Sequence, residues 1–190
     1  MNRRRVLKGF AALAGAGGLA SCAGAGVTRG QGENLQVATT SNQIVINGAP
    51  VDYRAVVAET LLPATETRPA AVAITNAYIR EGVANRSTRP ILFAFNGGPG
   101  ASSSPLHFDA LGPRVFVREP GQPARIANNS RSPLDAMDLV FIDPVGTGYT
   151  RILDGEDGGA LWSVLGDGEA AAEIIDAWLT EHDRHDSPRF

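Results

Sequence analysis

The sequence predicts an α/β fold, and three features carry this prediction. Two continuous apolar runs of strand length, "ILFAF" at 91–95 and "DLVFID" at 138–143, each lead into a glycine-rich loop. A helical pattern, "GDGEAAAEIIDAWLTEHDR", follows the second loop. Uninterrupted apolar runs are typical of strands covered on both faces, as in a parallel sheet. Their combination with a helix indicates the α/β class.

The first 21 residues predict an export signal. A positive stretch, Asn2 to Lys8, precedes an apolar run from Phe10 to Ala20 that is too short to span a bilayer. The Arg3-Arg4 pair resembles a twin-arginine signal, which the translocation machinery reads as an address. The chain would then be exported to the periplasm or the cell surface.

The sequence "LASC" before residue 23 resembles a bacterial lipobox. In that motif the cysteine is acylated, so Cys22 is the predicted lipidation site and membrane anchor. A plain signal peptide with a chance cysteine is the alternative. Cys22 is the only cysteine, which excludes an intrachain disulfide.

The charge of the chain argues against nucleic acid as a partner. The formal net charge is −3, and removal of residues 1–21, with four positive charges and no acid, changes it to −7. Scattered charges on an acidic chain provide no basic surface for a phosphate backbone.

Order is predicted to begin near residue 43. Residues 22–42 are small, polar and aperiodic, and we expect a flexible tether there. Residues 43–190 are expected to form the folded domain. Its first elements are a hairpin around Asn47-Gly48, a strong tight-turn signal, and an extended segment at 70–79.

The helical pattern has a predicted start and a predicted buried face. Asp167 is the expected N-cap. Apolar residues recur at helical spacing and form one stripe, which places Trp178 in the core. The stripe consists of Ala171, Ile174, Ile175, Trp178 and Leu179.

The loop "NGGPG" at 96–100 has two competing interpretations. A phosphate cradle would need G-x-x-x-x-G-K-[ST] or G-x-G-x-x-G leading into a helix, and neither pattern is present. An oxyanion hole needs a fixed backbone N–H that points at a developing negative charge, which bare glycines after a strand provide. The sequence therefore favours an oxyanion hole.

Four motifs in order resemble the serine carboxypeptidase family, the carboxypeptidase Y-like branch of the α/β-hydrolase fold. They are "NGGPGASSS", "LGPRV", "DLVFIDPVGTGYT" and "RHDSPRF". The resemblance runs from about residue 91 to residue 190. It implies an α/β-hydrolase fold that is incomplete here, with only the amino-terminal strands, the oxyanion loop and the first helices. It implies no cofactor and no metal.

The resemblance also implies roles for individual residues. Gly98 would donate its backbone N–H to the oxyanion. Asn96 and the Gly97 N–H would bind the C-terminal carboxylate of a peptide or protein substrate. A neighbouring loop, with Asp143, Gly146 and Tyr149, would form the edge of the substrate pocket.

In the family the nucleophile is none of the serines after the glycine loop. It stands on a later strand–helix elbow, which would begin just after Phe190, and the catalytic Asp and His come later still. No G-x-S-x-G occurs in residues 1–190. The chain thus resembles the amino-terminal fragment of such an enzyme, and we expect the 190-residue chain by itself to be inactive.

Two positions depart from the family pattern. Ala110 stands where many members have a glutamate that binds the substrate carboxylate, with Asp109 one residue away. The residue that usually separates Asp143 from Pro144 is missing. Both departures bear on carboxypeptidase specificity.

Other interpretations of the same residues are weaker. A compact triad of Ser102, Ser103 or Ser104 with His107 and Asp109 is disfavoured, because triad members normally come from separate elements. His107 is expected to be structural. A metal site at His182 and His185 lacks a supporting motif.

Two further function classes stay open. One is a non-catalytic surface lipoprotein that uses the fold as a binding module. The other is a proline-iminopeptidase-like hydrolase, whose loop usually has histidine where Asn96 stands.

Overall fold

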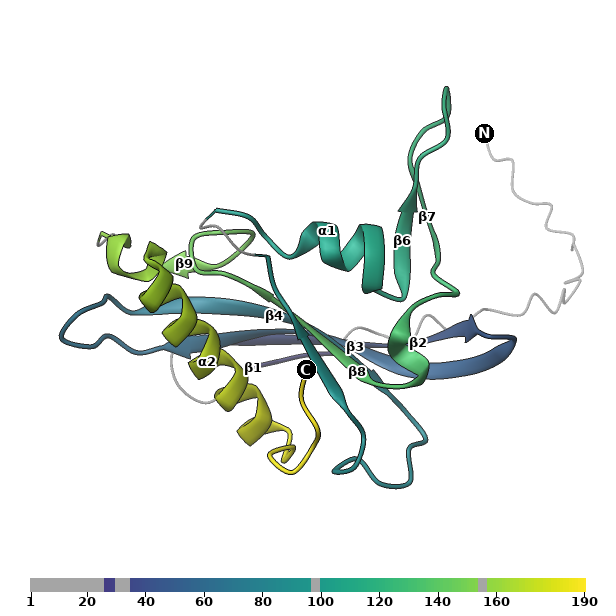
Figure 1. Ribbon diagram of the computed structural model, residues 1–190, viewed down its shortest axis with the longest axis horizontal. Helices are drawn as coiled ribbons and strands as arrows, with labels where there is room; N and C mark the ends of the chain where they lie inside the picture. Colours follow the sequence, from purple (N-terminus) through teal and green to yellow (C-terminus); the bar gives the residue numbers. More distant parts are fainter. Residues whose placement is uncertain (1–25, 30–34, 97–99, 154–156) are drawn as a thin grey trace, which may run out of the picture.

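A seven-stranded mixed sheet organises the chain. The computed structural model describes residues 26–29, 35–96, 100–153 and 157–190 (Figure 1). The strand order is β1-β2-β3-β4-β8-β5, and β9 pairs with β4 beside β8. The bounds are β1 Gly26–Arg29, β2 Gln36–Ile46, β3 Ala49–Leu62, β4 Ala71–Arg80, β5 Ile91–Ala94, β8 Asp138–Asp143 and β9 Arg151–Ile152.

The first four strands form an antiparallel meander. The predicted hairpin is confirmed: Asn47 and Gly48, with φ of 52° and 80°, make the two-residue turn between β2 and β3. Positive φ at both turn positions is what an Asn-Gly pair adopts most readily.

The predicted tether at 22–42 is wrong for residues 36–42, which form the first part of β2. Periodicity was a poor guide there because this part of the strand is only half-buried. This part of β2 is ordered because it pairs with the long strand β3, where Val37 of β2 lies opposite Ala58 of β3. Val37 also packs against the core.

Strand β5 runs parallel to its neighbour β8, as predicted, with Leu92 opposite Leu139. All six residues of β8 are buried. Val140 and Ile142 belong to one core cluster, and Leu139 and Phe141 belong to the other. This division explains the continuous apolar run, because successive side chains of a strand point to opposite faces and both faces are covered here.

Helix α2, Val164–Glu181, lies across the sheet (Figure 1). Trp178 packs edge-on against Phe93 with ring centroids 5.6 Å apart, so its predicted place in the core is confirmed. The predicted N-cap Asp167 is wrong. Ser163 is the N-cap, and its Oγ accepts from the Gly166 N–H at 3.0 Å. Asp167 lies in the first turn instead, where a negative charge complements the helix dipole.

The segment between β5 and β8 holds short helices and a protruding hairpin. The helical elements are α1 Ser104–Leu106, η1 His107–Leu111 and η2 Pro133–Asp135, and a further short helix, η3 Gly159–Trp162, precedes α2. The hairpin strands are β6 Arg114–Val117 and β7 Arg125–Asn128, which project away from the large sheet (Figure 1).

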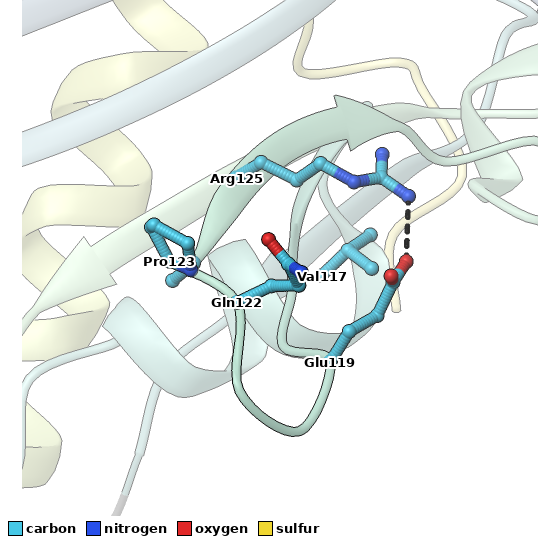
Figure 2. A pocket seen from close by; sticks show the side chains of 6 residues that line it. Val117, Glu119, Gln122, Pro123 and Arg125 are labelled. Atoms are coloured by element: carbon cyan, nitrogen blue, oxygen red, sulfur yellow. Dashed lines mark hydrogen bonds and ion pairs between the residues drawn. The ribbon is translucent and has the colours of Figure 1, made fainter.

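A hollow of about 390 Å³ lies at the tip of this hairpin. Figure 2 shows the side chains that line it. An ion pair between Arg125 and Glu119, 3.0 Å apart, borders it, and both side chains are more than half exposed. None of its lining residues comes from the loops after β5 and β8. We therefore assign it no catalytic role.

Among the described residues, α2 and the shorter helices all fall below the length and apolar character that a membrane-spanning helix requires.

Candidate active site

Two loops leave the sheet side by side at the carboxyl ends of β5 and β8. The strands are parallel neighbours with Ala94 opposite Phe141, so residues 95–104 and 143–150 emerge at the same edge. In α/β sheets, ligands bind at this edge. The predicted site residues Asn96, Asp143 and Gly146 all lie on these two loops.

Asn96 closes the first loop. Its side-chain amide donates to the Ser102 carbonyl at 2.7 Å, which ties the end of β5 to the start of the serine run. Gly97 and Gly98, to which substrate and oxyanion contacts are assigned by prediction, lie outside the described residues. Asn96 is half-buried and keeps a second amide N–H for another acceptor.

Asp143 joins the two loops. Its side chain is buried, and Oδ1 accepts from both the Ser103 N–H at 2.8 Å and the Ser103 hydroxyl at 2.7 Å. Gly148 packs so closely that a Cβ there would lie 2.2 Å from Asp143 Oδ2. In this arrangement Asp143 connects the serine loop to the end of β8, and its place at the edge of a substrate pocket stays a prediction.

The second loop is held by its own hydroxyl groups. The Pro144 carbonyl accepts from the Thr147 hydroxyl at 2.8 Å and lies 3.0 Å from the Thr150 hydroxyl. The Thr147 N–H donates to the Thr150 hydroxyl at 3.0 Å. These buried contacts fix the turn from within the loop.

A hollow of about 320 Å³ lies between the two loops and is lined by Gly100, Val145, Gly146 and Trp162. The Trp162 indole N–H donates to the Val145 carbonyl at 3.2 Å. Gly146 has φ of +87°, and a Cβ there would lie 2.7 Å from the Trp162 indole nitrogen. Gly146 therefore needs to be glycine on two counts, backbone conformation and space.

Tyr149 does not join this hollow. Its side chain is 85 % exposed and borders a separate hollow of about 290 Å³ over β2, β3 and β4. The structure thus brings together Gly146 with Gly100 and Trp162 but leaves Tyr149 on the far side of its loop.

His107 is structural, as expected, and the compact triad is absent. Its ring is buried, stacks on Phe141 with centroids 4.7 Å apart, and hydrogen-bonds the Tyr78 hydroxyl through Nε2. Burial lowers the pKa of His107 to about 4, although the nearby Asp143 carboxylate opposes this shift. Burial likewise raises the pKa of Tyr78.

The remaining members of the compact triad are also engaged elsewhere. Asp109 pairs with Arg118 at 2.7 Å, and the Ser103 hydroxyl donates to Asp143.

The histidines after α2 have structural contacts of their own. His182 stacks on Trp178 with centroids 4.1 Å apart, and burial lowers its pKa. His185 contacts the Thr180 hydroxyl at 3.0 Å. Within the described part of the chain, no three His, Cys, Asp or Glu side chains are grouped as a metal site would require.

Sequence reasoning missed the role of Trp162. The only available signal was its position, since Trp162 falls before the helical stripe and next to the serine that caps α2. The sequence also contained no sign that Asp143 accepts the hydrogen bonds from Ser103.

Comparison with known proteins identifies the family. A family model described as serine carboxypeptidase matches residues 78–190. No curated protein sequence matches the chain. Among solved structures it is similar to Kex1(delta)p, a prohormone-processing carboxypeptidase from Saccharomyces cerevisiae, with 20 % identity and a TM-score of 0.39.

That similarity covers 64 % of this chain and 22 % of the yeast chain, so the sequence spans about a fifth of that relative. The family match extends over more than half of the 190 residues, from within β4 onward. The α/β-hydrolase fold predicted from the sequence is confirmed, and the chain belongs to the serine carboxypeptidase family.

Proposed function

We propose that residues 43–190 are the amino-terminal part of an exported serine-type carboxypeptidase. The observation that carries the proposal is the double hydrogen bond from Ser103 to Asp143 at 2.8 and 2.7 Å. It fixes the glycine–serine loop after β5 against the loop after β8, at the sheet edge where hydrolases of this class bind substrate. An oxyanion hole requires donors held in a fixed place, and this contact anchors the serine end of the loop at Ser103.

The proposed chemistry is acyl transfer to a serine. The Gly98 N–H would donate to the oxyanion, and one such donor stabilises the transition state by about 2.7–4 kcal/mol. The nucleophile would come from sequence that follows residue 190, on a Gly-x-Ser-x-Gly elbow. Attack of this serine on the last peptide bond would form an acyl-enzyme and release the C-terminal residue as the leaving amine, and water would then free the shortened peptide.

Specificity for a free C-terminus would rest on Asn96 and the Gly97 N–H. Asn96 spends one amide N–H on Ser102 and has a second for the substrate carboxylate. The family's frequent glutamate is replaced by Ala110, and Asp109 is held by Arg118 at 2.7 Å. Asn96 therefore carries more of this selectivity here than in members that have the glutamate.

The first test is the source DNA beyond codon 190. We expect an in-frame Gly-x-Ser-x-Gly within about a dozen codons and a later Asp and His. A stop codon directly after codon 190 would instead favour the alternative, a non-catalytic binding module on the same fold.

The second test is activity of the product of the whole open reading frame. We expect it to release the last residue from an N-blocked dipeptide and to spare the same dipeptide with an amidated C-terminus. Cleavage of unblocked peptides from the amino end would favour the proline-iminopeptidase-like alternative, against which Asn96 argues.

Export and lipid anchoring complete the proposal. Arg3-Arg4 would direct the chain to the twin-arginine machinery, and acylated Cys22 would hold it at the membrane. Incorporation of labelled palmitate into the wild type, and its loss with release from the membrane fraction in Cys22→Ala, is the expected result. Equal labelling of both forms would contradict the lipid anchor.

A further inference from the structure

The chain returns to the sheet after α2 and pairs with the outer side of β5. The Ile91 N–H donates to the Pro188 carbonyl and the Phe93 N–H to the Phe190 carbonyl, both at 2.9 Å. The Phe190 N–H donates back to the Ile91 carbonyl at 3.0 Å. Ile91 and Arg189 form a parallel bridge, so this segment runs in the same direction as β5 (Figure 1).

A buried charge cluster lies at the start of this pairing. Asp138, the first residue of β8, accepts from Arg89 Nε at Oδ1 and from Arg184 Nη1 at Oδ2, each at 2.8 Å. The three side chains are 1 %, 8 % and 2 % exposed. The cluster therefore connects the residues before β5, the start of β8 and the segment after α2.

Arg184 uses its whole guanidinium in these contacts. Besides Asp138, its Nη2 donates to the Arg89 carbonyl at 2.8 Å and its Nε donates to the Ser187 hydroxyl at 2.7 Å. Arg89 lies two residues before β5, and Ser187 lies one residue before the segment that pairs with it. A lysine offers a single donor centre and cannot reproduce this fork.

We propose that Arg184 is a positioning residue that sets the register of the strand beginning at Pro188 against β5. A buried ion cluster is weak evidence for stability, but registry is the best-attested use of such groups. A slip of one residue would turn every side chain of that strand to the other face of the sheet. The inference rests on the proposed function for its catalytic consequence, because the proposed nucleophile would stand at the far end of this strand.

The catalytic consequence is a change in kcat. A misplacement of about 1 Å at a reacting group costs on the order of 100-fold in rate. Arg184 lies at the amino ends of the parallel strands, away from the loops at 95–104 and 143–150, so substrate binding should be little affected. Because a smaller folded fraction also lowers the apparent kcat at unchanged KM, kcat is expressed per active molecule, counted by active-site titration.

Arg184→Lys and Arg68→Lys, made in the product of the whole open reading frame, form the matched pair. Arg68 is equally buried and pairs with Glu173 on α2, but it contacts neither β5 nor residues 187–190. We expect Arg184→Lys to lower kcat about 100-fold with KM within about twofold, and Arg68→Lys to leave kcat within about twofold. Equal kcat effects in the two variants, or none in Arg184→Lys, would overturn the proposal.

Amide hydrogen exchange tests the register without relying on activity. In Arg184→Lys the amides of Ile91, Phe93 and Phe190 should exchange at least about tenfold faster than in Arg68→Lys and the wild type. Unchanged protection at these three amides would refute the inference. If exchange is faster in Arg184→Lys as expected, but the wild-type product hydrolyses no peptide, the proposed function fails and the register role of Arg184 stands.

Discussion

Two buried aspartates mark the ends of β8, and their surroundings differ. Asp138 at the amino end is neutralised by two arginines, whereas Asp143 at the carboxyl end accepts a backbone N–H and a hydroxyl from Ser103. The cationic partners come from segments distant in sequence, and Ser103 belongs to the loop that Asp143 supports. The amino end of β8 is thus fixed by charged partners, and the carboxyl end, beside the proposed oxyanion loop, is fixed by neutral donors.

Asp138→Asn should give the largest loss of stability. Removing the shared carboxylate leaves Arg89 and Arg184 buried without a counter-charge, which costs about 3–5 kcal/mol. Urea unfolding measures the effect. The control is Asp109→Asn, which breaks an exposed pair with Arg118 and should cost less than about 1 kcal/mol. Similar costs at both positions would remove the contrast drawn here.

Acidic pH should weaken the structure near the functional end through His107. Its folded pKa of about 4 lies below the ordinary value of 6.5, so the unfolded chain binds the proton more tightly. This contribution is fully present above pH 6.5 and is lost as the pH falls to about 4, by up to about 3 kcal/mol.

The slope of unfolding free energy against pH tests this contribution. It should be shallower between pH 6.5 and 4 in His107→Gln than in the wild type. An unchanged slope in His107→Gln would show that His107 does not carry this pH dependence.

Asp143→Ala should have a smaller effect on stability than Asp138→Asn and a larger one on activity. It leaves the Ser103 N–H and hydroxyl without their acceptor, at a cost of about 1–3 kcal/mol. Ser103→Ala removes only the hydroxyl contact and should cost about 1 kcal/mol. Peptidase assays on the product of the whole open reading frame should show a larger loss of activity in Asp143→Ala than in Ser103→Ala. Full activity in Asp143→Ala would show that Asp143 does not support the site.

Gly146→Ala should lower the free energy of unfolding by about 1–2 kcal/mol, because it forces a side chain into a left-handed backbone and against Trp162. Gly121→Ala, at φ of +76° with open space around it, isolates the backbone part of this cost. The difference between the two variants in thermal unfolding measures the contact with Trp162. It should vanish when Trp162 is replaced by alanine in both.

Sequence patterns predicted the elements whose apolar residues form either a continuous run or a stripe at helical spacing. The run 138–143 is β8 to the residue, and the apolar stripe of α2 identified Trp178 as core. The start of α2 was misplaced because Asp167 and Ser163 are both good caps, and only the hydrogen bond to Gly166 distinguishes them. The half-buried start of β2 has no strong period and depends on pairing with β3.

The site was predictable only where the family motifs named residues. Asn96, Asp143 and Gly146 came from those motifs, and the structure places them on adjoining loops. The hydrogen bond between Ser103 and Asp143 joins residues 40 positions apart, and the one between Trp162 and Val145 joins residues 17 positions apart. The charge cluster at the other end joins residues 46 and 95 positions apart, and no local pattern encodes such a meeting.

The pairing of residues 188–190 with β5 also bears on how the protein behaves in concentrated solution. Those three residues occupy amides and a carbonyl of β5 that would otherwise face outward. Unpaired strand edges attract strands of other molecules and lead to aggregation. Cutting the chain after Asp186 would leave these β5 amides and this carbonyl unpaired, and we expect such a truncated chain to aggregate more readily.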